Sequence, residues 1–127
     1  IYTLDIIKKR GVTVWRTVIA CMSLLLCACD FQKEADAKFG DQHFKTALSL
    51  VELHKVRTGA YPETLNDLKF TGDWDAIALS GVEYRRMDAG YELNLTRGWV
   101  GKPEVSYPPE FWKGLGLLKS NVKKGQG

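Results

Sequence analysis

Cysteine is absent after residue 29, since the three cysteines of the chain are Cys21, Cys27 and Cys29. No disulfide can therefore form within the segment that follows them. Two common active-site motifs are also absent: the Gly-x-Ser-x-Gly of many hydrolases and the Gly-Lys-Ser/Thr loop that cradles phosphates. The later serines stand in no context that would activate them; they are Ser49, Ser80, Ser106 and Ser120. The sequence thus singles out no catalytic residue and no cofactor.

The chain also lacks a long apolar run. A membrane-spanning helix needs about 20 mostly apolar residues, whereas Arg16 limits the run that ends at Leu26 to about a dozen. This length falls within the 7 to 15 residues that are typical of a signal-peptide core. The pattern therefore favours a signal peptide over a single-pass anchor.

A surplus of basic residues is missing from most of the chain. The formal net charge is +3, and residues 1–28 account for all of it, with Lys8, Lys9, Arg10 and Arg16 against Asp5. The remaining residues carry fourteen basic and fourteen acidic side chains. Nucleic-acid-binding domains usually have a basic surplus or stripe, so we expect no nucleic-acid partner.

The most informative stretch is the junction at Leu26-Cys27-Ala28-Cys29. A basic cluster and a short apolar run precede it, and the polar residues 30–38 follow it, which is the order of a signal peptide with a small-residue cleavage site. The four residues resemble the lipobox of bacterial lipoproteins, in which the last residue is the acylated cysteine. The resemblance implies that residues 1–28 are a signal peptide and that Cys29 is lipidated, which would hold the protein at the periplasmic side of the cell membrane.

Asp30, directly after the cysteine, resembles the residue that retains enterobacterial lipoproteins in the inner membrane. This resemblance slightly favours the inner over the outer membrane. The alternatives are a single-pass anchor, ordinary secretion with cleavage at another small residue, and a prepilin leader. The last rests on a faint likeness of residues 9–14 to the start of pilins, but Arg16 stands where that family has a glutamate.

The rest of the chain fits one modest domain. Residues 29–40 are small or charged and predict a tether. A helix is expected from Asp41, a good N-cap, to Gly59, which can take a positive φ at the C-terminus. Its apolar residues, among them Leu48, should form the core, with Glu52 at the surface. Residues 114–127 contain three lysines and predict a flexible basic tail, so the globular domain should span residues 41–113.

The next elements lie between residues 61 and 107. Thr64 and Asp67 form a capping-box signal for a second, short helix. Residues 71–80 predict a loop with one helical turn. The alternating runs 82–87 and 91–96 predict an antiparallel hairpin, and residues 104–107 a third, edge strand.

A buried helix, a Gly-x-Tyr-Pro element, a short Leu-x-x-Leu helix and then strands resemble the globular part of type IV pilins and of the major pseudopilins of type II secretion. The likeness covers residues 44–96 and implies an α+β fold, with an N-terminal helix packed on a small antiparallel sheet.

Three groups of residues are candidates for chemistry or binding. His43 and His54 would lie on nearly one helical face but about 16 Å apart, too far to share a metal ion, so we expect structural or solvent-facing roles. Asp73 and Asp75 could hold calcium, but they fit a solvated turn better. Four aromatic residues could close the core or form an interaction patch: Trp99, Tyr107, Phe111 and Trp112.

Together these features predict a non-enzymatic lipoprotein of the cell envelope that binds or positions another envelope protein, with neither a metal nor a cofactor. An immunity or inhibitor lipoprotein that neutralises a toxin is an alternative of the same general class. A weak hydrolase is an alternative of a different class. It would need a pocket that joins His43 or His54 to a carboxylate and a nucleophile.

Overall fold

A computed structural model describes residues 2–125, with side chains placed for residues 14–22 and 30–125. The chain divides into two compact units, Ile1–Lys33 and Glu34–Gly127. The described residues of the first unit all belong to helix α1 (Tyr2–Thr58). The second unit, called the globular unit below, combines residues 34–58 of α1 with a small sheet. The predicted α+β fold, with an N-terminal helix on a small sheet, is therefore confirmed.

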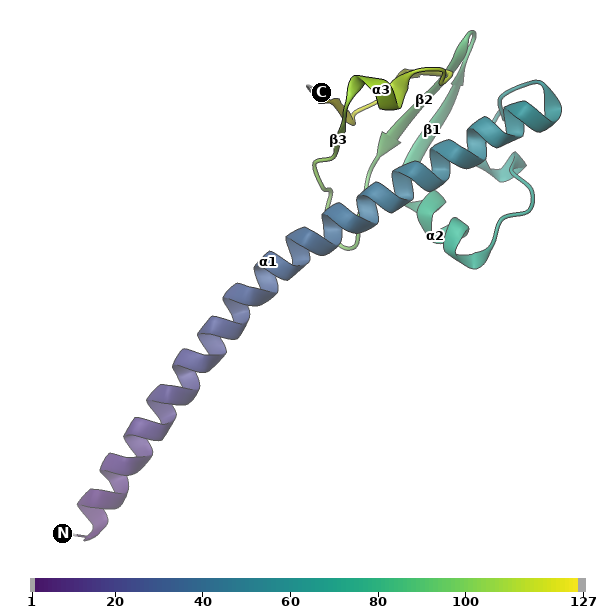
Figure 1. The fold of residues 1–127 in the computed structure, drawn as a ribbon. Coiled ribbons are helices and arrows are strands. Elements are labelled where there is room, and N and C mark those ends of the chain that lie inside the picture. The colour runs from purple at the N-terminus through teal and green to yellow at the C-terminus, as the bar shows by residue number, and fades with distance from the viewer. Residues whose placement is uncertain (1, 126–127) are drawn as a thin grey trace. The chain divides into compact units, whose positions relative to one another are not determined.

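The elements that follow α1 are short (Figure 1). In chain order they are η1 (Leu65–Asp67), α2 (Asp73–Ser80), β1 (Val82–Met87), β2 (Gly90–Leu95), β3 (Ser106–Tyr107), α3 (Pro109–Trp112), β4 (Leu117–Lys119) and β5 (Lys123–Lys124).

The main sheet has the strand order β1-β2-β4. Strands β1 and β2 form the predicted antiparallel hairpin, with Val82 opposite Leu95 and Met87 opposite Gly90. Strand β4 joins the other edge of β2 in parallel, so the sheet is mixed and not purely antiparallel. A parallel neighbour needs a long crossover connection, and residues 96–116 supply it. Strands β3 and β5 form a separate parallel pair.

The core lies between α1 and the inner face of this sheet. The helix contributes Phe44, Ala47, Leu48 and Val51, and β2 contributes its alternate residues Tyr91, Leu93 and Leu95, all buried. Residues spaced by three or four positions share one face of a helix, and alternate residues share one face of a strand. The periodicities in the sequence therefore meet in one apolar layer.

The prediction that residues 29–40 form a tether needs correction. Residues 34–40 belong to the globular unit, and Gly40 lies inside α1, where it does not interrupt the helix. A Cβ atom on Gly40 would lie 2.4 Å from Cγ of Pro103. The glycine is therefore explained by the close approach of the chain at Pro103.

Helix α1 of the globular unit ends as predicted. Gly59 has a φ of 87°, and its N–H donates to the carbonyl of Lys55 at 2.8 Å. The short second helix is also confirmed as η1, because the Thr64 N–H donates to the Asp67 carboxylate at 3.1 Å.

Two further segments differ from their predictions. Residues 73–80 form helix α2 where a loop with one turn was expected. The Gly72 N–H donates to the Asp75 carboxylate at 2.8 Å and satisfies the first turn of α2. The expected flexible tail instead carries β4 and β5. Val122 is part of the core, which explains why this segment packs against the sheet.

Candidate functional site

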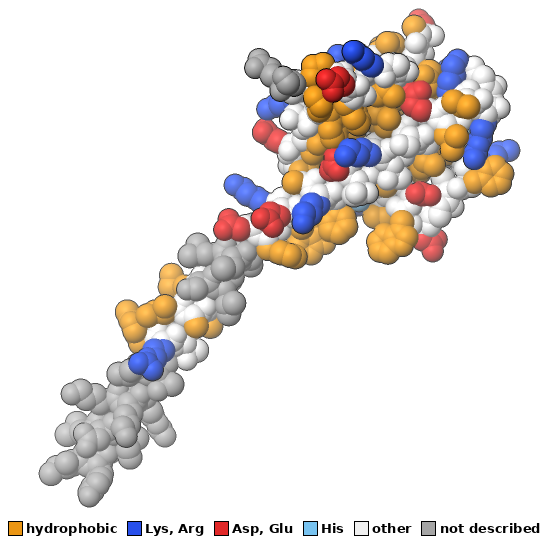
Figure 2. All heavy atoms as spheres, viewed as in Figure 1, with side chains coloured by type: hydrophobic (Ala, Val, Ile, Leu, Met, Phe, Trp, Pro, Cys, Tyr) orange, Lys and Arg blue, Asp and Glu red, His pale blue; other side chains and the backbone are white. Residues whose placement is uncertain are grey.

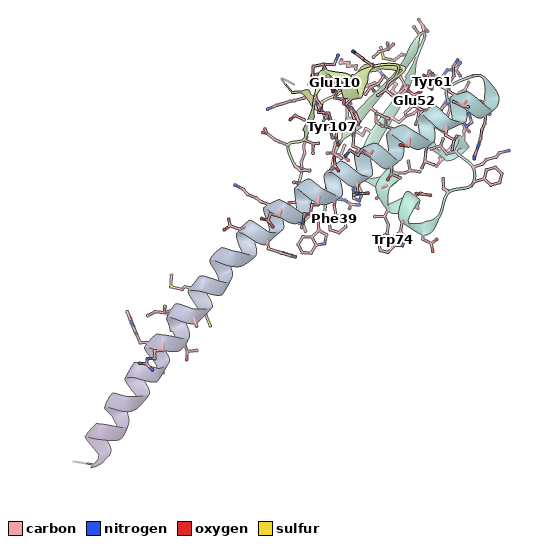
Figure 3. The ribbon with its side chains drawn as sticks, viewed as in Figure 1. Phe39, Glu52, Tyr61, Trp74, Tyr107 and Glu110 are labelled. Carbon is pink, nitrogen blue, oxygen red and sulfur yellow. The ribbon has the colours of Figure 1, made fainter. Side chains whose placement is uncertain are left out.

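Glu52 on α1 joins three segments that are distant in the sequence. Its carboxylate accepts hydrogen bonds from the Tyr91 hydroxyl at 2.8 Å, the Gly116 N–H at 2.9 Å and the Tyr61 hydroxyl at 3.1 Å. Figure 3 shows Glu52 and Tyr61 close together near the end of α1. The sequence predicts Glu52 at the surface, but its side chain is half-buried and accepts these three hydrogen bonds.

The tyrosines around Glu52 are held in their neutral form. Burial, and then the hydrogen bond to Glu52, raise the pKa of Tyr91 far above its ordinary value. Burial also raises the pKa of Tyr84 to about 12, and the Tyr84 hydroxyl donates to the Pro62 carbonyl. Because a phenol must stay protonated to donate a hydrogen bond, these groups are structural donors.

A second carboxylate on α1, Asp36, holds the loop that follows β2. One of its oxygens accepts hydrogen bonds from three consecutive backbone N–H groups: Trp99 at 2.9 Å, Val100 at 2.7 Å and Gly101 at 2.9 Å. The hydrogen bonds from Val100 and Gly101 hold the pKa of Asp36 below its ordinary value. Three donors converging on one carboxylate stabilise its charged form and fix the loop to the helix.

The predicted aromatic patch separates into two parts. Tyr107, Phe111 and Trp112 pack with Phe44 of the core, and the rings of Tyr107 and Phe111 stack with centroids 4.1 Å apart. The Tyr107 hydroxyl donates to Asp41 at 2.7 Å. These three residues therefore close the core, as the first of the two readings expects. Trp99 belongs to the loop that Asp36 holds, and its side chain is 49% exposed.

The two histidines have different environments. His43 is buried, and its Nδ1 lies 3.3 Å from the Arg97 carbonyl, which fits the structural role expected for it. His54 lines a surface groove that also contains Arg57. In the part of the chain whose side chains are placed, no cluster of three or more His, Cys, Asp and Glu residues could hold a metal ion.

The aspartates considered for calcium are on α2. Asp75 accepts the Gly72 N–H and caps the helix, and Asp73 stands in the same first turn. Acidic residues at this end are favourable because of the helix dipole. Capping thus accounts for this pair.

The residues of the predicted anchor lie in the first unit. The side chain of Cys29 lies outside the described residues, and Asp30 is exposed on α1. Among the described residues, no helix is both long and apolar enough to cross a membrane.

The face of α1 that the sheet leaves uncovered carries a second stripe of residues at three- and four-residue spacing: Phe39, Gln42, Thr46, Leu50, Leu53 and Arg57. Two grooves follow this stripe. One, of about 280 Å³, lies between α1 and α2 and is lined by Phe39 and Trp74, which Figure 3 shows on the same side of α1. Figure 2 shows hydrophobic side chains exposed along this part of the surface.

The other groove, of about 270 Å³, lies between the end of α1 and residues 68–70. We call it the Arg57 groove. Its helix side is formed by Leu50, Leu53, His54 and Arg57, and its opposite side by Leu68, Lys69 and Phe70. Nothing in the local sequence pattern marks residues 68–70 as neighbours of Arg57.

Comparison with known proteins adds no relative. No protein-family model, no curated protein and no solved structure matches the chain.

Proposed function

We propose that the chain is a lipid-anchored lipoprotein of the bacterial cell envelope, with a non-catalytic binding or structural role at the periplasmic face of the membrane. The observation that carries the proposal is the order of residues before position 30. The basic cluster Lys8-Lys9-Arg10, the short apolar run and the lipobox-like Leu26-Cys27-Ala28-Cys29 follow one another as in a lipoprotein signal.

The start of the globular unit supports anchoring near the bilayer. Only six residues separate Cys29 from Asp36, and Asp36 is already hydrogen-bonded to the loop at residues 99–101. Even a fully extended chain of this length spans at most about 25 Å. An acylated Cys29 would therefore keep the globular unit close to the membrane surface.

The surface of the globular unit supports a binding role. Trp74 is 80% exposed, and it borders the groove between α1 and α2 on the uncovered stripe of α1. Large aromatic side chains are enriched where proteins bind partners. We therefore assign partner recognition to the groove between α1 and α2 that Trp74 borders, and anchoring to Cys29.

The test compares the natural protein with Cys29→Ser in fractionated cells. We expect the natural protein in the membrane fraction and the variant largely outside it. The variant lacks the thiol that would be acylated, and a stable anchor needs two or more acyl chains. Equal membrane association of both would contradict lipid anchoring. Asp30→Ser, separated on a density gradient, tests sorting: a shift from the inner to the outer membrane is expected if Asp30 is the retention signal.

A further inference from the structure

The Arg57 groove is lined by apolar and by basic side chains. Leu50, Leu53 and Leu68 supply the apolar surface, and His54, Arg57 and Lys69 supply nitrogen groups. No acidic residue lines the groove. A ligand that fits this lining needs an apolar body and a negative end.

The basic groups of Arg57 and Lys69 are available to a ligand. Among the described residues, neither Arg57 nor Lys69 forms an ion pair with a carboxylate. The Arg57 guanidinium instead lies over the ring of Phe70, 5.5 Å from its centroid. This contact holds the guanidinium beside the groove and leaves its hydrogen-bond donors able to meet an anion, which Arg binds in a bidentate manner.

Phe70 itself is unusual in two respects. It has a φ of 61°, a left-handed conformation that is unfavourable for a residue with a bulky side chain. Its ring is also 87% exposed, so burial does not compensate the strain. Strained residues concentrate at binding and catalytic sites, and here the strain places an aromatic ring at the wall of the groove.

We propose that the Arg57 groove binds one medium-chain fatty acid, with its carboxylate at Arg57 and Lys69 and its alkyl chain along Leu50, Leu53 and Leu68. The volume of about 270 Å³ lies just below the range of about 300–1,000 Å³ for ligand sites. This size suits a single chain and is too small for a diacyl lipid. A free phosphate or sulfate would leave the leucines exposed to water.

The inference goes beyond the proposed anchoring and does not depend on it, because every lining residue lies between positions 50 and 70. A failure of fatty-acid binding would leave membrane fractionation unchanged. Conversely, loss of the anchor would leave the groove intact.

The experiment uses the full chain in nanodiscs of neutral phosphatidylcholine and a photoreactive diazirine analogue of dodecanoate. We expect saturable labelling that maps to the peptides containing residues 50–57 and 68–70, and competition by unlabelled dodecanoate. Dodecanol, which has the same chain without the charge, should compete much more weakly. Equal competition by dodecanol, or labelling spread over the surface, would overturn the proposal.

Two variants test whether the charge of Arg57 contributes to binding beyond general apolar adsorption. Arg57→Gln should raise the dodecanoate concentration for half-maximal labelling about tenfold, which corresponds to the loss of about 1.4 kcal/mol. Lys38→Gln, an exposed lysine of the same helix, is the matched control and should change nothing. Identical curves for the two variants would overturn the role of Arg57.

The variant Phe70→Gly distinguishes a role of the Phe70 ring in binding from a role in folding stability. Glycine adopts a positive φ without strain, so the variant should keep or raise the melting temperature while labelling falls. Trp74→Ala, which removes a similarly exposed ring outside the groove, should leave labelling unchanged. If Phe70→Gly is labelled as strongly as the natural protein, or if it loses stability and labelling together, a binding role for the ring is contradicted.

A photoreactive acidic amphipathic peptide tests the other occupant of the groove. Labelling of the groove by this peptide, with none by the fatty acid, would assign the groove to a protein partner and overturn the proposal.

Discussion

Glu52 shows at the scale of one residue how distant segments are held together. Its substitution by alanine would leave the hydroxyl of Tyr91, a fully buried residue, without its acceptor. An unsatisfied buried donor and the lost charge-assisted hydrogen bonds together cost roughly 3 kcal/mol. We therefore expect Glu52→Ala to lower the free energy of unfolding by this amount in urea denaturation.

Ser49→Ala is the matched control for Glu52→Ala. Ser49 is exposed on the same helix, and its hydroxyl donates only to the Lys45 carbonyl at 2.7 Å. Its substitution by alanine should change the free energy of unfolding by less than about 0.5 kcal/mol. Equal and small effects of the two variants would show that the Glu52 hydrogen bonds contribute nothing. The sequence did not reveal these bonds, because the partners lie nine, 39 and 64 residues away.

Asp36 makes the loop after β2 sensitive to acid. Because its pKa is lowered in the folded state, its contribution to stability is fully present above the ordinary value of 3.8 and is lost as the pH falls through the lowered folded value. The amide NMR signals of Trp99, Val100 and Gly101 should titrate together with a midpoint below pH 3.8. A common midpoint at or above that pH would contradict the arrangement.

At the scale of elements, α1 and β2 supply most of the buried core of the globular unit. Leu48 is buried in this layer, whereas Val56 on the same helix is 79% exposed. Leu48→Ala should lower the free energy of unfolding by about 2–5 kcal/mol through lost burial and a cavity. Val56→Ala should change it by less than about 0.5 kcal/mol. Similar effects of the two, measured by chemical denaturation, would place the core elsewhere.

The elements that could be predicted from the sequence are those with a local signal. The hairpin follows from the alternation of Tyr91, Leu93 and Leu95, and the end of α1 from Gly59. Strand β4 has no such signal, because its pairing with β2 is a long-range contact. The fixed position of the last segment depends on Asn121, whose side chain bonds both the N–H and the carbonyl of Leu95 at 2.8 Å.

Helix α2 and the Arg57 groove were missed for different reasons. The spacing of Gly72 and Asp75 is a capping signal, but the sequence of residues 71–80 as a whole favours a loop with one helical turn. The groove brings the last turns of α1 to residues 68–70, and its wall depends on the backbone conformation of Phe70. Such a conformation is not readable from residue types, since left-handed backbone is rare for phenylalanine.

At the scale of the whole molecule, charge and hydrophobicity divide the chain at the same place. The first 28 residues hold the net positive charge and the apolar run, and the remainder is neutral. We propose that this boundary separates a signal peptide, which is removed, from the mature chain, which keeps the lipid anchor on Cys29. Covalent attachment of two or more acyl chains makes membrane attachment of a protein stable, whereas a single chain gives reversible attachment.

Mass spectrometry of the natural protein purified from membranes tests the central claim most directly. We predict a mature chain that begins at Cys29 and carries acyl chains on that residue, with residues 1–28 removed. Tandem fragmentation would place the added mass on the first residue. An unmodified Cys29, or a membrane-bound chain that retains residues 1–28, would contradict the account.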